Sequence, residues 1–164
     1  MTNRVVSSLL FSALLVLAIG GTAPSAVGQR TSGAAGLGGQ VGDPSGVTFK
    51  IYNAGAPSYD FLGAWSSVND FFFLNAHALF EEPIDAENVD QPLEWFIGPG
   101  GFIGTFEGGG PFEGEAVLGI SGTVGLQTEL ADHFELYIQA TPRFALIPET
   151  EGDLGGGLGL RYYF

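Results

Sequence analysis

The residues of this chain that could do chemistry are charged side chains placed singly within stretches of alternating apolar residues. The ionisable residues on the polar side of these stretches are Lys50, Asp60, His77, Glu94, Glu129, Glu135, Arg143 and Arg161. Such a set could line a gated path for a solute, or its members could pair inside a barrel. Isolated charges are very costly in a low-dielectric interior, so pairing is the expectation. The predicted interior polar network consists of Lys50, His77, Glu135, Gln139, Arg143 and Arg161, with Glu135, Arg143 and Arg161 as its core.

Enzymatic activity is not expected from these residues. The chain has two histidines and no cysteine, so a cysteine nucleophile is excluded. His77 has no serine two residues away, and His133 falls at an expected turn. No serine stands in the strand-to-helix elbow that a hydrolase uses. The catalytic set is therefore predicted to be empty.

Metal and cofactor sites are not expected either. The acidic stretch 81–87 offers oxygen ligands of the kind that calcium and magnesium take, but it lacks the spacing of a calcium loop. The glycine runs 98–104 and 155–159 lack the GxGxxG spacing and the following helix of a phosphate-binding loop. These glycines favour close packing inside a barrel instead. No metal site and no cofactor are predicted.

The stretch around which the chain is organised is its last dozen residues, DLGGGLGLRYYF at 153–164. Its leucines, with Tyr162 and Phe164, share one parity, whereas most of its glycines, with Arg161 and Tyr163, share the other. Successive side chains of a strand point to opposite faces. The stretch therefore predicts a strand with an apolar outer face and a small or polar inner face, which suits the wall of a closed barrel in lipid.

Alternation of the same kind predicts eight strands, at 35–41, 47–52, 59–66, 71–80, 93–106, 116–129, 134–146 and 153–164. The sequence Asp43-Pro44-Ser45-Gly46 predicts a tight turn between the first two. Pro99 and the glycines beside it predict a bulge or distortion in the fifth. The predicted fold class is all-β, an eight-stranded antiparallel up-and-down β-barrel of the transmembrane type over residues 35–164.

Residues 1–28 have the composition of a signal peptide. Arg4 supplies the positive start, 5–19 the apolar core, and Ala26-Val27-Gly28 a small-x-small cleavage site. The apolar core is shorter than the roughly 20 residues that a membrane-spanning helix needs. Residues 29–34 are a predicted linker. The mature chain is therefore expected in the periplasm, in the outer membrane or outside the cell.

The composition favours a barrel whose apolar face meets lipid over a soluble β-barrel. Glycine makes up 27 of 164 residues and gathers on the expected inner face, as a narrow barrel requires. Aromatic residues such as Tyr59, Trp65, Phe80 and Trp95 fall near strand ends, as in an interfacial girdle. The formal net charge of −13 repels nucleic acid, so no nucleic-acid partner is expected.

The closing residues 161–164, RYYF, resemble the recognition strand of outer-membrane β-barrels. The stretch GLGGQVGDPSGVTFK at 36–50, with GGGLGLRYYF at the C-terminus, resembles a little-characterised group of small bacterial outer-membrane proteins of the OmpA/OmpX type. The resemblance implies an eight-stranded barrel in the cell outer membrane, surrounded by outer-membrane lipids. It also implies that the barrel-assembly machinery reads Tyr162 and Phe164. It implies no biochemical activity.

The predicted function is that of an integral outer-membrane barrel with a structural or interaction role and a polar, side-chain-filled interior. Two alternatives remain open: a lipocalin-like barrel that carries a small ligand or lipid, and a narrow pore. A carrier would need a large apolar interior, whereas the interior parity here is polar. Eight strands leave little lumen for a pore. The sequence selects no oligomeric state.

Overall fold

The computed structural model describes residues 30–55, 57–66, 71–85, 92–106, 115–131 and 133–164. The predicted signal peptide, residues 1–28, lies outside the described residues. The regular elements of the described part are eight strands: β1 (Ala35–Asp43), β2 (Gly46–Ile51), β3 (Ser58–Ser66), β4 (Phe71–Ile84), β5 (Leu93–Phe106), β6 (Glu115–Leu130), β7 (Phe134–Ile147) and β8 (Glu151–Tyr163).

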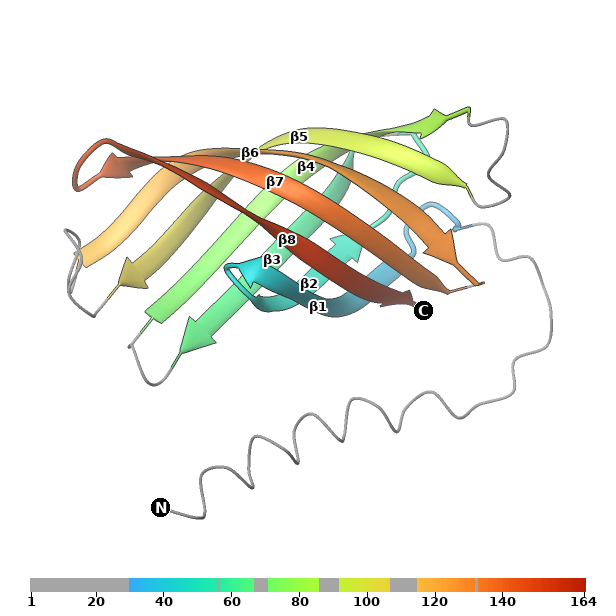
Figure 1. Cartoon of the computed structure of the whole chain (residues 1–164), viewed down its shortest axis with the longest axis horizontal. Coiled ribbons are helices and arrows are strands. Elements are labelled where there is room, and N and C mark those ends of the chain that lie inside the picture. Colours follow the sequence, from blue (N-terminus) through green and yellow to red (C-terminus); the bar gives the residue numbers. More distant parts are fainter. Residues whose placement is uncertain (1–29, 56, 67–70, 86–91, 107–114, 132) are drawn as a thin grey trace, which may run out of the picture.

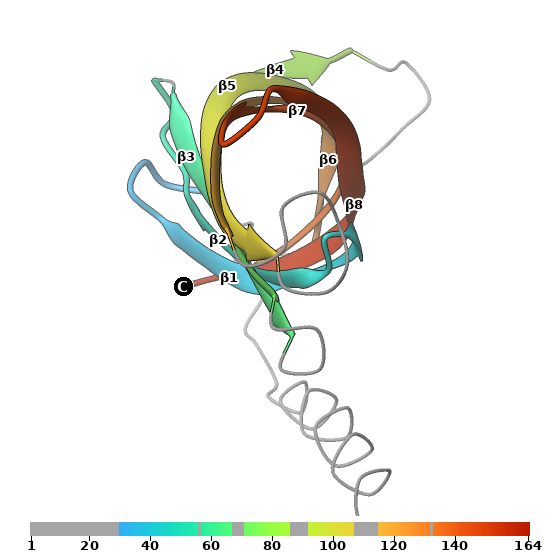
Figure 2. The same cartoon turned by 90° about the vertical axis from the view of Figure 1, so that its left-hand side faces the viewer.

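The eight strands close into one barrel. Each strand pairs antiparallel with the next along the chain, and β8 pairs back with β1 from Gly36–Tyr163 to Asp43–Gly156. Figure 1 shows the strands slanting across the long axis, and Figure 2 shows them as a ring seen from one end. In the described part of the chain, no helix is long and apolar enough to cross a membrane. The predicted all-β fold with an eight-stranded antiparallel barrel is confirmed.

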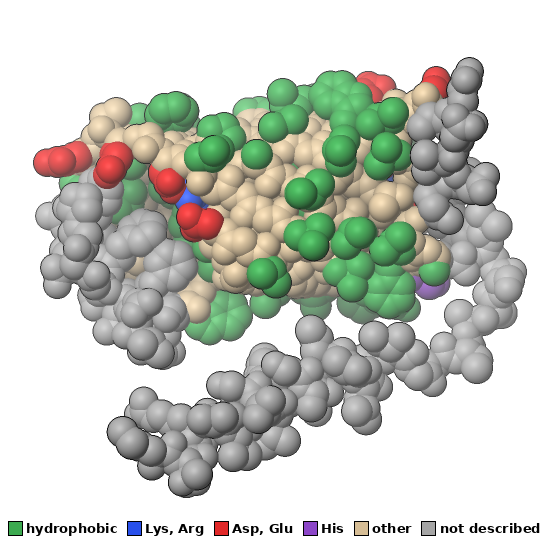
Figure 3. Space-filling view, in the orientation of Figure 1, with side chains coloured by type: hydrophobic (Ala, Val, Ile, Leu, Met, Phe, Trp, Pro, Cys, Tyr) green, Lys and Arg blue, Asp and Glu red, His purple; other side chains and the backbone are tan. Residues whose placement is uncertain are grey.

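Side chains alternate between the two faces of the wall because the strand repeat is two residues. In β7, Glu135, Tyr137 and Gln139 are buried inside the barrel, whereas Ile138 is 56% exposed and Phe144 is 52% exposed on the outside. Figure 3 shows hydrophobic side chains and backbone over the middle of one outer face, with acidic side chains toward the ends. The wall thus has an apolar outer face, while most of its polar side chains point inward.

Strand β4 is longer than its alternation predicts. It runs to Ile84 rather than to Phe80, so Glu81 is a strand residue instead of the first residue of a polar loop. Acidic residues are depleted in strands, which is why the stretch 81–87 does not look like one. The inward side chain of Glu81 is stabilised by an ion pair with Lys50.

The bulge or distortion predicted in β5 takes the form of a gap in its pairing with β4, without a change of register. The paired positions of β4 and β5 stop at His77–Gly100 and resume at Phe80–Ile97 in the same register. Pro99 lies in this gap and has no N–H to donate to the ladder. The pairing of β5 with β6 runs through Pro99 unbroken. The register shift lies instead between β6 and β7, at Leu118/Gly119.

The barrel has two open ends, and the wall is not equally high all the way round them. At the terminal mouth, β1 begins at Ala35 and β8 ends at Tyr163; at the opposite mouth, the predicted tight turn joins Asp43 to Gly46. Strands β1 and β2 have 9 and 6 residues, whereas β4 to β8 have between 13 and 16. The wall at the opposite mouth is therefore lower on the side of β1 and β2.

Apolar side chains fill part of the interior. Two buried clusters consist of Ala64, Phe73, Phe102, Val117 and Ala145, and of Leu79, Phe96 and Tyr137. Inward glycines make room for these rings: a Cβ on Gly159 would lie 2.2 Å from the ring of Tyr137. The interior of an eight-stranded barrel is just wide enough for side chains to fill. The glycines on the inner face therefore follow from the presence of large rings there.

Candidate functional site

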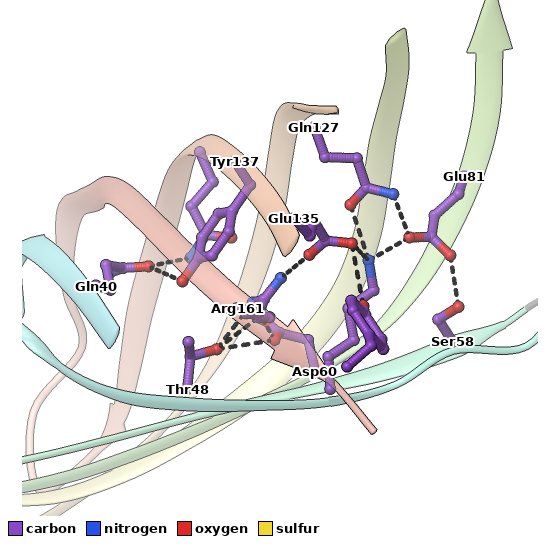
Figure 4. Close-up of polar contacts among 12 residues, drawn as sticks. Gln40, Thr48, Ser58, Asp60, Glu81, Gln127, Glu135, Tyr137 and Arg161 are labelled. Carbon is purple, nitrogen blue, oxygen red and sulfur yellow. Dashed lines mark hydrogen bonds and ion pairs between the residues drawn. The ribbon is translucent and has the colours of Figure 1, made fainter. Parts of the chain in front are cut away.

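Arg161, from β8, lies at the centre of a buried polar network (Figure 4) and is only 1% exposed. Its Nη1 donates to Glu135 at 2.6 Å and its Nη2 donates to Asp60 at 2.5 Å. Thr48 Oγ1 accepts from Nε at 3.0 Å and from Nη2 at 2.8 Å. The guanidinium also lies 3.8 Å from the centroid of the Tyr137 ring. One side chain thus ties together β2, β3, β7 and β8.

Glu135 is the carboxylate that several cations share. It is fully buried and lies directly opposite Arg161 in the register of β7 and β8. Its Oε2 accepts a hydrogen bond from Lys50 Nζ at 3.0 Å and another from the Tyr163 hydroxyl at 3.0 Å. Arg30 Nη1 donates to the same oxygen at 2.5 Å. These donors compensate for the loss of water around a buried carboxylate.

Lys50 links Glu135 to a second buried carboxylate across the barrel. The Lys50 side chain is fully buried, and its Nζ pairs with Glu81 and donates to Gln127 Oε1 at 2.8 Å. Gln127 Nε2 in turn donates to Glu81 at 2.6 Å, and Ser58 Oγ donates to Glu81 at 2.5 Å. The network therefore crosses the interior from β2 to β4 and β6, as Figure 4 shows.

The segment before β1 lies against the end of β2. Gly33 N donates to Tyr52 O at 2.7 Å, and Tyr52 N donates to Ala34 O at 2.9 Å. Residues 30–34 are the described part of the predicted linker. Their backbone bonds place Arg30 at the terminal mouth, where its side chain enters the barrel.

Arg30 is held at this mouth by three carboxylates. It forms ion pairs with Glu94 at 2.8 Å, with Glu135 at 2.5 Å, and with Glu129. Its guanidinium lies 4.7 Å from the centroid of the Tyr52 ring. Burial by itself lowers the pKa of Arg30, but the negative charges of Glu135 and its other acidic neighbours raise that pKa above its ordinary value. Arg30 therefore remains a cation in the site.

Gln139 belongs to an uncharged cluster that meets the charged network at Tyr137, whose ring lies against Arg161. Its Nε2 donates to Gln40 Oε1 at 2.9 Å, and the Tyr137 hydroxyl donates to the same oxygen at 3.1 Å. Thr123 Oγ1 donates to Gln139 Oε1 at 3.3 Å. This cluster joins β1, β6 and β7 in the interior.

His77 meets a serine that its own sequence neighbourhood does not contain. Ser121 Oγ lies 3.1 Å from His77 Nε2 and donates to Asn75 Oδ1 at 2.9 Å. His77 and Ser121 come together because Gly100, which pairs with both, puts no side chain between them. His77, Ser121 and Asn75 thus form one hydrogen-bonded cluster inside the barrel.

Arg143 lies apart from the rest of the predicted network. It pairs with Asp153 and lies 3.7 Å from Asp43, and both of these carboxylates are well exposed at the opposite mouth. Its guanidinium is 5.3 Å from the centroid of the Phe73 ring. Eight residues of β7 separate Arg143 from Glu135, which is about 26 Å along a strand. Arg143 is thus buried and ion-paired, as predicted for an inward charge, but it does not contact Glu135 or Arg161.

The structure thus brings Lys50, Glu135 and Arg161 together and links Gln139 to them through Gln40 and Tyr137. It leaves His77 and Arg143 in two other places. Several partners were not predicted as members of the network: Arg30, Thr48, Asp60, Glu81, Gln127 and Tyr163. Parity could have found Thr48 and Gln127, which alternate with apolar residues. Arg30 precedes the first alternating stretch, so no periodic signal marks it.

Tyr162 and Phe164 lie on the outer face at the terminal mouth. Tyr162 is 40% exposed and Phe164 is 76% exposed. The Tyr162 ring makes edge contacts with Phe134 at 5.2 Å and with Phe164 at 5.4 Å between centroids. These rings form part of an aromatic rim. That the barrel-assembly machinery recognises Tyr162 and Phe164 stays a prediction.

The buried polar side chains of the described residues satisfy one another. Among the described residues, every buried side-chain nitrogen and oxygen has a hydrogen-bond partner. The same residues contain no group of three or more histidines and acids arranged to hold a metal ion. The charged side chains make ion pairs with one another instead of converging on an open position. Such pairing compensates for the burial of the charges.

No protein-family model matches this chain, and no curated protein matches it. Among solved structures, the crystal structure of Neisserial surface protein A is similar to it, with 12% identity and a TM-score of 0.44. The match covers 80% of this chain and 94% of that chain. At this level of likeness, no function passes from that protein to this one.

Proposed function

We propose that the chain is an integral outer-membrane β-barrel protein with a structural or interaction role and no enzymatic activity. The observation that carries the proposal is the orientation of the wall, which is apolar outside and holds a network of ion pairs inside. A soluble barrel has the reverse arrangement, because its outer face meets water.

The outer face supports a lipid environment. Large apolar side chains along the middles of neighbouring strands are half exposed, among them Ile120 at 55%, Val124 at 47% and Leu158 at 53%. A continuous apolar face of this kind is unusual on a monomer in water and marks a membrane or protein contact. Tyr59, Phe80 and Trp95 lie on the outer face near the terminal mouth, where an interfacial aromatic girdle would lie.

The interior favours a structural role over a carrier or a pore. Arg161, Lys50 and Glu135 fill the interior toward the terminal mouth with their own hydrogen-bond partners, and Tyr137 and Phe96 fill space beside them. A carrier needs an apolar cavity, and a pore needs a continuous water-filled lumen. The paired charges of this interior supply neither.

Fractionation tests the proposed location. We expect the full-length protein, expressed in a cell with an outer membrane, to sediment with outer membranes after removal of the predicted signal peptide. We also expect it to migrate differently on a gel before and after boiling, as folded membrane barrels do. Recovery of the protein wholly in the soluble periplasm would overturn the membrane proposal and would favour the carrier.

Conductance tests the proposed role. Liposomes or planar bilayers that contain the refolded barrel should show no conductance, or a very small one, because side chains fill the lumen. Ion flow of the size seen with open barrels would contradict a structural role and would favour the pore. The matched sample is the same bilayer with the boiled, unfolded protein.

A further inference from the structure

The terminal mouth contains a group of acidic and aromatic side chains that surround one cation. We call it the carboxylate cage: Glu94 from β5, Glu129 from β6 and Glu135 from β7, with the rings of Tyr52 and Tyr163 beside them. All three carboxylates contact the guanidinium of Arg30. The two rings lie 4.7 and 5.5 Å from the guanidinium carbon. The Arg30 side chain is only 7% exposed.

The carboxylates of the cage belong to strands of the barrel wall, whereas the cation between them does not. Glu129 and Glu135 lie directly opposite each other in the register of β6 and β7. Like charges at directly opposed positions of a sheet destabilise it unless a cation lies between them. Arg30, which fills this place, belongs to the segment before β1 and to no strand of the barrel. The wall therefore presents a site for a cation that the chain supplies from elsewhere.

The carboxylates beside the cage add to its excess of negative charge, so that a further cation is attracted there. The cage continues into the network of Asp60 and Glu81, where Lys50 and Arg161 are the cations. Five carboxylates thus face three cations when Arg30 is in place, and two when it is withdrawn. An excess of negative charge in a partly desolvated site attracts positive ligands strongly.

The shape of the cage selects a guanidinium over a metal ion. Its carboxylates bond different nitrogens of a planar group: Glu94 binds Nη2, Glu129 binds Nε and Glu135 binds Nη1. Among the described residues, no cluster of acids and histidines is arranged to hold a metal ion. Aromatic faces attract a planar cation in addition to the carboxylates. A guanidinium satisfies all of these contacts at once.

We propose that the terminal mouth is a guanidinium-binding site that Arg30 occupies within the chain and that takes a guanidinium-bearing ligand when Arg30 is withdrawn. The proposal holds whether or not the barrel lies in a membrane, because it depends only on the fold. Its failure and that of the proposed function are therefore distinguishable.

Chemical rescue tests this site. The full chain with Arg30→Ala, refolded and purified, should melt at a lower temperature than the wild type by circular dichroism. Methylguanidinium chloride at about five times its dissociation constant should raise that melting temperature by about 2–4 °C and should leave the wild type unchanged. The shift should saturate with concentration, as binding at one site requires.

Three controls make the rescue specific. Sodium chloride and tetramethylammonium chloride at the same ionic strength should give smaller shifts, because neither ion donates N–H bonds to carboxylates. Arg143→Ala removes a cation at the opposite mouth, where the carboxylates are exposed, and should show no rescue. In Arg30→Ala/Glu129→Gln the apparent dissociation constant for methylguanidinium should rise at least tenfold.

Equal shifts with sodium or tetramethylammonium, or an equal shift in the wild type, would overturn the proposal. If Arg30→Ala does not fold without a ligand, the refolding yield replaces the melting temperature as the measurement. A yield that recovers with methylguanidinium then supports the site, and one that does not recover excludes it.

Discussion

At the scale of residues, the interior depends on pairs in which one cation serves two acids on different strands. Arg161 joins Asp60 of β3 to Glu135 of β7, and all three side chains have at most 2% of their surface exposed. A buried charge that loses its partner costs far more than an exposed one, because water cannot replace the lost interaction. Substitution of one of these few buried residues should therefore lower the stability of the barrel far more than substitution of an exposed charge.

We predict that Arg161→Met destabilises the barrel by about 3–5 kcal/mol, because it leaves the buried carboxylate of Asp60 without a cation and removes one of the three cations that share Glu135. Arg143→Met is the matched control, since Asp153 and Asp43 remain in water; it should cost about 0–1 kcal/mol. The measurement is urea unfolding in detergent micelles, followed by tryptophan fluorescence. Equal midpoints for the two variants would show that the central network does not stabilise the fold. Normal folding of Arg161→Met with an altered conductance would instead point to a pore.

At the scale of elements, the fit between inward glycines and rings fixes how closely the strands approach. A Cβ on Gly159 of β8 would meet the Tyr137 ring of β7, and that ring cannot retreat because it stacks on Arg161. Gly63 of β3 has no atom within 4 Å of such a Cβ. Gly159 therefore leaves space that a neighbouring ring fills, whereas Gly63 has open space beside it.

We predict that Gly159→Ala destabilises the barrel by about 1–3 kcal/mol, the usual cost of overpacking. Gly63→Ala should be neutral or stabilising by up to about 1 kcal/mol, because glycine in a strand loses more conformational entropy than alanine. Heat-modifiability gels run over a temperature series, with unfolding midpoints in urea, measure both variants. A tolerated Gly159→Ala would mean that the Tyr137 ring has room to move.

The strands themselves could be predicted from the sequence, because the two-residue repeat fixes which side chains share a face. The repeat does not say which inward residues meet across the barrel. Lys50 meets Gln127 and Ser121 meets His77 only because of the tilt and register of strands that are far apart in sequence. Arg30 lies outside any repeat, and Glu81 lies in an acidic stretch that is typical of a loop. Both were therefore missed as members of the network.

At the scale of the whole molecule, the barrel exposes hydrophobic side chains along its middle and acidic side chains near its ends (Figure 3). The net charge of −13 thus does not oppose insertion into a bilayer, provided that the charges lie inside the tube or at its mouths. If the outer face contacts lipid, the loss of stability caused by a new charge on it should depend on the height of that charge along the barrel. If the outer face is in water, the loss should be the same at every height.

Strand β6 offers two outward positions that test this dependence on height. Val124 lies near the middle of the strand and pairs with Ile97 and Ala140, whereas Leu130 is its last residue at the terminal mouth. In lipid bilayers we predict that Val124→Arg lowers the free energy of unfolding, and so destabilises the barrel, by about 2–4 kcal/mol, and that Leu130→Arg lowers it by about 0–1 kcal/mol. Refolding titrations in lipid vesicles measure both. Because the two variants share a strand and a face, a common cost would mean that height in the barrel does not matter, and the outer face would not be the one that contacts lipid.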